Sequence, residues 1–424
     1  MDGSEPQEPD VPVRAHRLAP MRGRDPHEKH RVSTPLELLF DLTFTVAFGV
    51  AAAQLSHMLA AGHVGAGITA FLFATFAVCL AWINFTWFAS AYDTDDWAFR
   101  LMTMVEMVGV LILALGLPAF FASVEEGHHV NNAVLVAGYV VMRIALVAQW
   151  LRAVKQDPAR RTAGLTYTTV VLVAQLGWVG TVFLPTPVPV TLSIWFALAV
   201  VELGGPMLAE ARCGGTPWHA HHIAERYGLL AIIALGEGVV GTVATLSADI
   251  GEYGWSADAV LLAVSGVALT FGMWWVYFMV PAADALHAHR ERSFWFGYLH
   301  MPVFGAIVAT GSGLHTAAFF IQHHSELGPV ATVLSVVIPV AVYIALVYVM
   351  YLLMLRAGDT LHVLLVVLTA AVLAGAVGLA AAGVPMAVCL LVASLAPMVS
   401  VAGFEIVGHR HAAAAVAASS VSGP

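Results

Sequence analysis

Four charged side chains fall inside long apolar runs of the sequence: Asp41, Arg143, Glu202 and Glu237. Glu237 lies 12 residues past Glu225, which is about 18 Å along a helix and so deep in a bilayer core of about 30 Å. A carboxylate there costs on the order of 2.5–3.5 kcal/mol. It needs a cationic partner, a proton or a water-filled cavity, which makes proton or cation movement the chemistry to consider.

Arg143 is the natural counter-ion for these acids, because it is the basic residue farthest from the end of a predicted helix. We therefore predict one interior cluster that contains Arg143 and at least two of Asp41, Glu202 and Glu237. Such a cluster could be a structural network of paired charges or a path for protons or cations. The sequence leaves both interpretations open.

Two further acids, Glu37 and Glu106, lie closer to the ends of predicted helices. Glu37 is four residues before Asp41, so both project from the same face of one helix. These acids could join the interior network. Alternatively, their side chains could bend toward the membrane interface, an interpretation that suits these two best.

Three histidines and an acid lie close together before another apolar run: His219, His221, His222 and Glu225. Imidazoles at this spacing could bind zinc or copper. We favour a second interpretation, a polar helix entry in which Glu225 lies near the positive helix N-terminus and Arg226 anchors the helix at the interface. The ligand spacing follows no fixed pattern, so we expect no metal and no cofactor.

The composition places these residues in a membrane protein. Of 424 residues, 59% are hydrophobic and only 11% are charged, and the mean hydropathy is +0.83. Soluble domains average about 25% charged residues. We predict an all-α, polytopic integral membrane protein whose main partner is the lipid bilayer, with a small ion or a proton as the candidate cargo. We expect no nucleic-acid partner, and the sequence predicts no oligomeric state.

Hydropathy predicts twelve transmembrane helices in two halves. Five segments follow from this: a disordered cytoplasmic N-terminal segment, a first six-helix repeat, a cytoplasmic linker that holds the histidines, a second six-helix repeat and a disordered tail. In that order, the five segments span residues 1–33, 34–210, 211–225, 226–408 and 409–424.

The basic residues alternate along the predicted loops. Seventeen of the 18 Lys and Arg residues lie before the first helix, in every second loop or after the last helix, and Arg143 is the exception. The positive-inside rule therefore predicts that both termini are cytoplasmic.

Similar residues recur at a constant offset, which favours a duplication. Trp82 near the end of the second predicted helix corresponds to Trp274, and Pro206 corresponds to Pro397, at offsets of 274 − 82 = 192 and 397 − 206 = 191. Because six helices is an even number, both repeats would point the same way across the membrane.

Two stretches resemble a known family. Glu37-Leu-Leu-Phe-Asp41-Leu42, and His222-Ile-Ala-Glu225-Arg226-Tyr-Gly228-Leu229 with the later Leu235-Gly-Glu237, are similar to signatures of the bacterial low temperature requirement protein A family. The similarity spans about residues 30–408. Many relatives have Ser where this chain has Gly238, so no mechanism for this chain can depend on a hydroxyl group at that position. The resemblance implies a multi-pass membrane protein and no particular activity.

Three classes of function fit these observations. A transporter or ion pathway, which we favour, would use the buried acids and needs them to converge on a wet cavity. A structural or membrane-adaptation protein without a pore needs each acid paired and dry. A membrane enzyme, which we consider the weakest of the three, would need the histidines beside a lipid-facing cleft.

Overall fold

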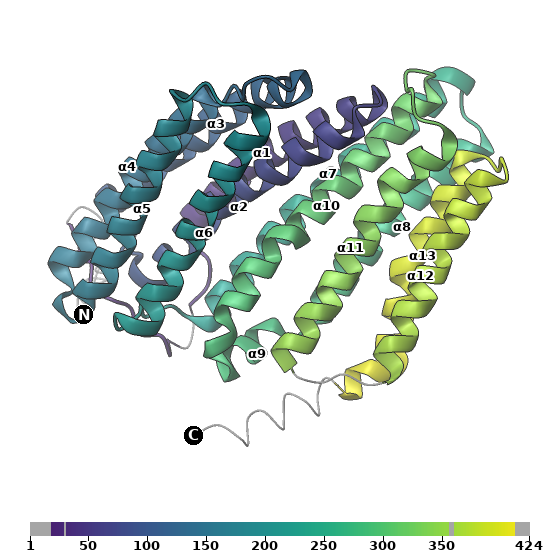
Figure 1. The fold of residues 1–424 in the computed structure, drawn as a ribbon. Coiled ribbons are helices and arrows are strands. Elements are labelled where there is room, and N and C mark those ends of the chain that lie inside the picture. Colours follow the sequence, from purple (N-terminus) through teal and green to yellow (C-terminus); the bar gives the residue numbers. More distant parts are fainter. Residues whose placement is uncertain (1–17, 29–30, 356–359, 412–424) are drawn as a thin grey trace, which may run out of the picture.

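The computed structural model describes residues 18–28, 31–355 and 360–411. Within these ranges, twelve helices are long and apolar enough to cross a membrane, which confirms the predicted all-α membrane architecture. The helices run side by side between two ends of the molecule (Figure 1). The long helices are α1 Pro35–Ala60, α2 Val64–Tyr92, α3 Trp97–Glu126, α4 Ala133–Gln156, α5 Arg161–Val182, α6 Val188–Arg212, α7 Ala220–Tyr253, α8 Ala257–Phe278, α10 Ser293–Ile321, α11 Pro329–Leu355, α12 Thr360–Ala381 and α13 Met386–Gly403.

Polar capping residues define several helix starts. The Thr34 hydroxyl accepts a hydrogen bond from the backbone N–H of Glu37, and the Glu37 side chain accepts one from the backbone N–H of Thr34, so α1 begins with a complete capping box. Asp96 and Ser256 each cap a helix start, that of α3 and that of α8, by accepting a backbone N–H. These caps satisfy backbone donors that a bilayer cannot satisfy.

Two boundaries differ from the sequence prediction. Helix α6 ends at Arg212 and α7 begins at Ala220, with His219 as its N-cap, so only residues 213–219 of the predicted linker 211–225 connect two helices. The polar residues between 220 and 225 are helical because α7 extends beyond the apolar run that hydropathy detects. A short helix, α9 (Ala282–Ala288), occupies the connection after α8 that was expected to be a loop.

The N-terminal segment was predicted to be disordered, but its described part packs on the bundle. Met21 is fully buried, and its backbone N–H donates to Gln156 Oε1 at 2.5 Å. The backbone N–H of Ala19 donates to Asp96, and Arg31 is only 6% exposed. At the other end, His409–His411 are helical, and the rest of the predicted tail lies outside the described residues.

The two halves of the chain meet through four helices. Helices α1 and α2 of the first half pack against α7 and α10 of the second half. Small residues permit close packing within each half: a Cβ atom on Gly138 of α4 would come 2.4 Å from the backbone N of Leu113 in α3.

The contacts within the halves correspond only in part. Helix α1 packs on α3 and α3 on α4, as α7 packs on α10 and α10 on α11. However, α8 packs along α13, whereas the corresponding α2 packs on α1, α3 and α10. The duplication of Trp82 and Trp274 therefore stays a prediction, to be tested by superposing the two halves.

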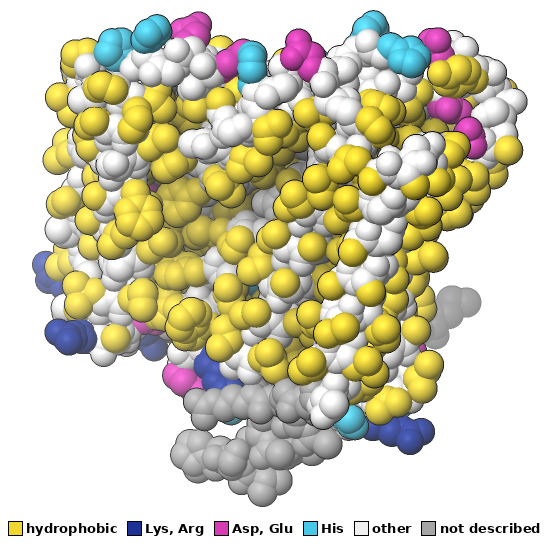
Figure 2. Space-filling model, turned by 45° about the vertical axis from the view of Figure 1, so that its right-hand side comes forward, with side chains coloured by type: hydrophobic (Ala, Val, Ile, Leu, Met, Phe, Trp, Pro, Cys, Tyr) yellow, Lys and Arg dark blue, Asp and Glu magenta, His cyan; other side chains and the backbone are white. Residues whose placement is uncertain are grey.

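Charge is distributed unequally between the two ends of the bundle. On the face shown in Figure 2, Lys and Arg side chains gather at one end, and His, Asp and Glu side chains crowd the other. The predicted alternation of basic loops requires such a separation.

Cysteine labelling tests the predicted orientation. The three native cysteines, Cys79, Cys213 and Cys389, are first replaced by Ala. Single cysteines at His63, Gly127 and Glu252, which are all exposed, should then react with a membrane-impermeant maleimide added outside intact cells. A single cysteine at the exposed Lys155 should react only after lysis, and its labelling from outside would reverse the orientation.

Candidate functional site

A buried arginine links the two halves of the bundle. Arg226 lies six residues after the start of α7 and is completely buried. Its guanidinium group donates two hydrogen bonds to Asp41 of α1, from Nε to Oδ2 at 3.0 Å and from Nη2 to Oδ1 at 2.5 Å. This two-pronged contact is the strongest way in which arginine binds a carboxylate. Arg226 was predicted to lie at the membrane interface, and the structure corrects this placement.

Asp41 has a third partner from another helix. Trp82 of α2 donates its indole N–H to Asp41 Oδ1 at 2.6 Å. The Trp82 ring also packs edge-on against Tyr227, with ring centroids 4.8 Å apart, and the Arg226 guanidinium lies 5.7 Å from the Trp82 ring centroid. Trp82 is therefore part of the site, although its sequence position indicated only a repeat.

Glu37 uses its two carboxylate oxygens differently. Oε2 completes the capping box at the start of α1. Oε1 accepts a hydrogen bond from Arg226 Nη1 at 2.9 Å and lies 3.4 Å from Nη2 of Arg31. Glu37 is completely buried, so of the two alternatives that the sequence left open it joins an interior network and does not turn toward the interface. The reason is that Arg226 supplies a cation within the bundle.

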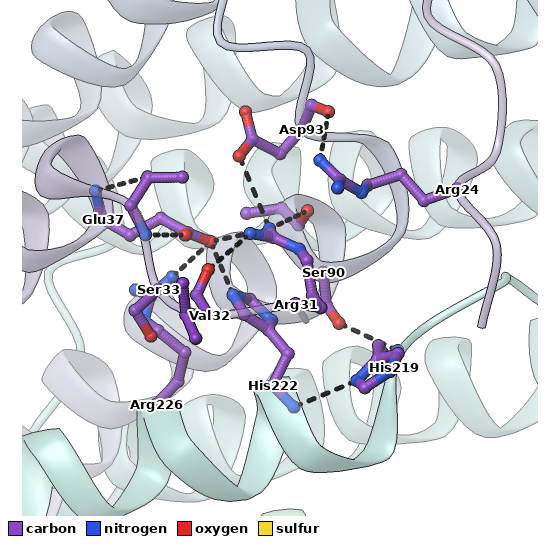
Figure 3. Close-up of polar contacts among 12 residues, drawn as sticks. Arg24, Arg31, Val32, Ser33, Glu37, Ser90, Asp93, His219, His222 and Arg226 are labelled. Carbon is purple, nitrogen blue, oxygen red and sulfur yellow. Dashed lines mark hydrogen bonds and ion pairs between the residues drawn. The ribbon is translucent and has the colours of Figure 1, made fainter. Parts of the chain in front are cut away.

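Arg31 lies between Glu37 and Asp93 (Figure 3). Its Nη2 lies 3.4 Å from both Glu37 Oε1 and Asp93 Oδ2. His222 Nε2 lies 3.1 Å from Glu37 Oε1, but the angles are not those of a hydrogen bond, and neither ring nitrogen of His222 has a hydrogen-bond partner. We call these residues the Arg226 network: Arg31, Glu37, Asp41, Trp82, Asp93, His222 and Arg226.

The Arg226 network holds more acids than bases. Two guanidinium groups face three carboxylates, and His222 is the remaining group that can take up a proton. Burial and the nearby Glu37 carboxylate raise the pKa of Asp93 to about 6, although Arg31 acts in the opposite direction. The network can therefore gain a proton near neutral pH.

The other histidines of the predicted cluster have separate partners. The His219 ring accepts the backbone N–H of His222 through Nδ1, and its Nε2 lies 2.8 Å from the Glu28 carbonyl oxygen. Burial lowers the pKa of His219. His221 packs beside His219 and His287, and Glu225 accepts the backbone N–H of Ser33 at 3.3 Å. No group of three metal-binding side chains occurs in the described ranges.

Arg143 forms a second, separate pair. Its Nη2 donates to Glu202 Oε1 at 3.0 Å, and its guanidinium lies 4.9 Å from the Tyr139 ring centroid. Arg143 and Glu202 are each 4% exposed, yet Arg143 Nε and Glu202 Oε2 have no hydrogen-bond partner. Glu106 is also buried and accepts a hydrogen bond from Gln149 at 3.3 Å, so it too lies inside the bundle and does not turn toward the interface.

Glu237 stands apart from both ion networks. It lies 17 residues after Ala220 in a helix of 34 residues, which places it at the middle of α7. Its Oε1 would be 3.2 Å from a Cβ atom on Gly49 of α1, and the Glu237 backbone packs against Gly311 of α10. Glu237 is buried and has no hydrogen-bond or ion-pair partner among the residues that the structure describes.

The predicted single cluster is therefore wrong in its membership. Arg143 pairs with Glu202, Asp41 pairs with Arg226, and Glu237 pairs with neither arginine. The prediction treated Arg226 as an interface residue because it stands in a polar stretch. The long α7 instead carries Arg226 into the bundle beside α1.

Comparison with known proteins identifies the chain. A model of the bacterial low temperature requirement A protein (LtrA) family matches residues 32–397. The chain belongs to this family. It is also 28% identical over 307 residues to an uncharacterized protein of Rhizobium meliloti (strain 1021), a match that covers 69% of this chain and 70% of that protein.

The two stretches that suggested the LtrA family meet in the Arg226 network. The stretch at the start of α1 contributes Glu37 and Asp41, and the stretch at the start of α7 contributes His222 and Arg226. Arg31 and Asp93 lie outside both stretches. Their polar character was visible in the sequence, but nothing in their spacing indicated that they would reach Glu37.

Removing the central cation should destabilise the protein strongly. Arg226→Met leaves Glu37 and Asp41 buried without their main partner, a change that costs about 3–5 kcal/mol. Thermal unfolding in detergent should show a large loss, whereas Arg212→Met, at an exposed position, should change little. The triple variant Arg226→Met, Glu37→Gln, Asp41→Asn should recover most of the loss. An Arg226→Met protein as stable as Arg212→Met would contradict this account.

Asp93 should make stability depend on pH. Its pKa is raised from 3.8 to about 6 in the folded protein, so its contribution is fully present below about pH 4 and is lost as pH rises through about 6. The wild type should lose roughly 3 kcal/mol relative to Asp93→Asn over that range, at 1.36 kcal/mol for each pH unit. Parallel unfolding titrations of both proteins measure this difference, and a difference that stays constant with pH would exclude it.

Proposed function

We propose that this LtrA-family protein moves protons or small cations across the membrane along the contact of α1, α7 and α10. The observation that carries the proposal is Glu237, a carboxyl group at the middle of α7 without a partner in the described structure. A structural protein would be expected to pair such a group or to replace it with an apolar side chain, since an unpaired buried acid costs stability.

Further unpaired polar atoms lie along the same contact. Asp41, Thr45 and Gly49 follow one another at intervals of four residues along one side of α1, and His57 lies eight residues beyond Gly49. Thr45 Oγ1 is buried without a hydrogen-bond partner, and so is His315 Nδ1 of α10, which interacts electrostatically with His57. Such atoms are the ones that water molecules or ions would satisfy.

The spacing of these groups suits a relay. Gly49, against which Glu237 lies, is eight residues from both Asp41 and His57, or about 12 Å of helix in each direction. His57 is exposed and borders an open depression with His323 and Glu326 at the acidic end of the bundle. The Arg226 network lies at the basic end. Water would have to carry the proton across both intervals.

The structural alternative rests on the other buried acids. Glu37, Asp41 and Glu202 all pair with arginines, as a protein without a pore would require. The enzyme alternative has less support, because the His219 ring binds backbone groups and the His222 ring is enclosed in the bundle 3.1 Å from Glu37. We therefore assign a structural role to the Arg226 network, which joins the helices, and a role in conduction to Glu237. We place the protein in a bacterial inner membrane with both termini cytoplasmic.

Liposome flux tests the proposal. Purified protein is reconstituted with a pH-sensitive dye inside, and a membrane potential is imposed; separate vesicles report Na⁺ and K⁺ entry. We expect flux in the wild type and a loss of at least about tenfold in Glu237→Gln, because the amide cannot exchange a proton or bind a cation as a carboxylate does. Glu252→Gln, at the exposed end of α7, is the matched control.

Two results would overturn the proposal. A folded Glu237→Gln protein with unchanged flux would remove Glu237 from the mechanism. Wild-type vesicles that pass neither protons nor either cation would favour the structural alternative. Circular dichroism and gel filtration of each variant show whether a loss of flux reflects misfolding.

A further inference from the structure

A small cavity lies between the two halves of the bundle, apart from the α1–α7–α10 contact. Its volume is about 30 Å³, which is room for roughly two water-sized groups. Its wall comes from α2, α4, α5, α6 and α10, and the side chains that matter most are Trp87, Trp150, Tyr167, Glu210, Phe294 and Tyr298.

Three of the aromatic side chains of this wall have their polar atoms engaged elsewhere. The Tyr167 hydroxyl donates to Glu210 Oε1 at 2.9 Å, the Tyr298 hydroxyl donates to the Leu203 carbonyl at 2.7 Å, and the Trp87 indole N–H donates to the Tyr227 hydroxyl at 3.0 Å. These three side chains can offer a ligand only their ring surfaces, and the Tyr167 ring already stacks on Trp150 with centroids 4.4 Å apart. Electron-rich ring faces attract cations.

A narrow recess extends the cavity toward a buried carboxylate. The recess has a volume of about 10 Å³ and shares Asn84, Tyr167 and Pro206 with the cavity. Glu202 lines it. Its Oε1 is bound by Arg143, and Oε2 is buried and accepts no hydrogen bond of good geometry, although the Trp178 indole N–H lies close enough to interact with this carboxylate. A buried carboxylate oxygen without a donor is costly, so the recess favours a ligand that brings N–H or O–H groups.

The charges around the cavity favour a cation. Glu106 and Glu202 share the single guanidinium of Arg143, and Glu210 adds a further carboxylate to the wall. Arg290 interacts electrostatically with Glu210, but its guanidinium stacks on Trp218 at 3.7 Å and donates to the Trp218 carbonyl. Two carboxylates, Glu202 and Glu210, therefore line the cavity and its recess, and no basic side chain does.

We infer that this cavity binds a primary ammonium group, either the ammonium ion or the head of a primary amine. The N–H groups donate to Glu202 Oε2, and the aromatic rings surround the positive charge. A quaternary ammonium group has no N–H to donate and needs more space than the cavity offers. A free amine and the ethanolamine headgroup of a lipid present the same chemistry, and the experiment separates them.

Calorimetric titration of delipidated protein in detergent tests the inference. Ethylammonium chloride should bind saturably, and tetramethylammonium chloride should bind at least about tenfold more weakly. Glu202→Gln should weaken ethylammonium binding at least about tenfold. Because that variant also leaves Arg143 unpaired, Asn84→Leu provides a second test that fills the cavity and keeps the ion pair. Glu252→Gln, far along α7, should bind like the wild type.

Three results would each overturn the inference. The first is equal affinity for ethylammonium and tetramethylammonium, and the second is ethylammonium binding that survives both Glu202→Gln and Asn84→Leu. The third is a titration with ethylammonium that shows no heat of binding. Nanodiscs then identify the source of the amine. Competition by phosphatidylethanolamine, but not by phosphatidylglycerol, would assign the site to a lipid headgroup. Ethylammonium binding that is equal in both lipids would assign it to a free amine. Either result is independent of flux through Glu237.

Discussion

The requirement that a buried charge be paired determines how the two halves of this protein meet. Arg226 is fully enclosed, and removing a guanidinium group from water costs several kcal/mol unless carboxylates and hydrogen bonds replace the solvent. Asp41 and Glu37 of α1 supply those carboxylates, and Trp82 of α2 binds the oxygen of Asp41 that Arg226 Nη2 also contacts. The pairing fixes the register of α1 against α7, since sliding either helix would leave the ions unpaired.

The register of α1 against α7 also positions the other residues of the candidate pathway. With Asp41 held by Arg226, the face of α1 that carries Thr45 and Gly49 lies against α7, and Gly49 faces Glu237. Gly311 lets α10 approach the backbone at the same level. The paired network and the unpaired acid are therefore two parts of one arrangement. The network joins α1, α2 and α7, whereas Glu237 lies farther along α7, where α1 and α10 pack against it, and has no partner in the described part of the chain.

Hydropathy and loop charge were sufficient to predict the twelve helices, because a bilayer imposes a length and a composition on each span. The acids inside those helices were also recognised from the sequence. Their pairing was not predictable, because burial alone cannot choose among Asp41, Glu202 and Glu237 as partners of Arg143, and Arg226 stood in a polar stretch. Arg31 and Asp93 were missed because a loop residue shows its tertiary partner only when the chain is folded.

Infrared spectroscopy of Glu237 tests the central claim most directly. The spectrum of the wild type minus that of Glu237→Gln isolates the carboxyl stretching band of this one side chain. If Glu237 lies on a water-connected path, the band should change as the bulk pH is raised and should shift when H₂O is replaced by D₂O. A band that is unaffected by both changes would show a sealed, dry carboxyl group and would contradict the account.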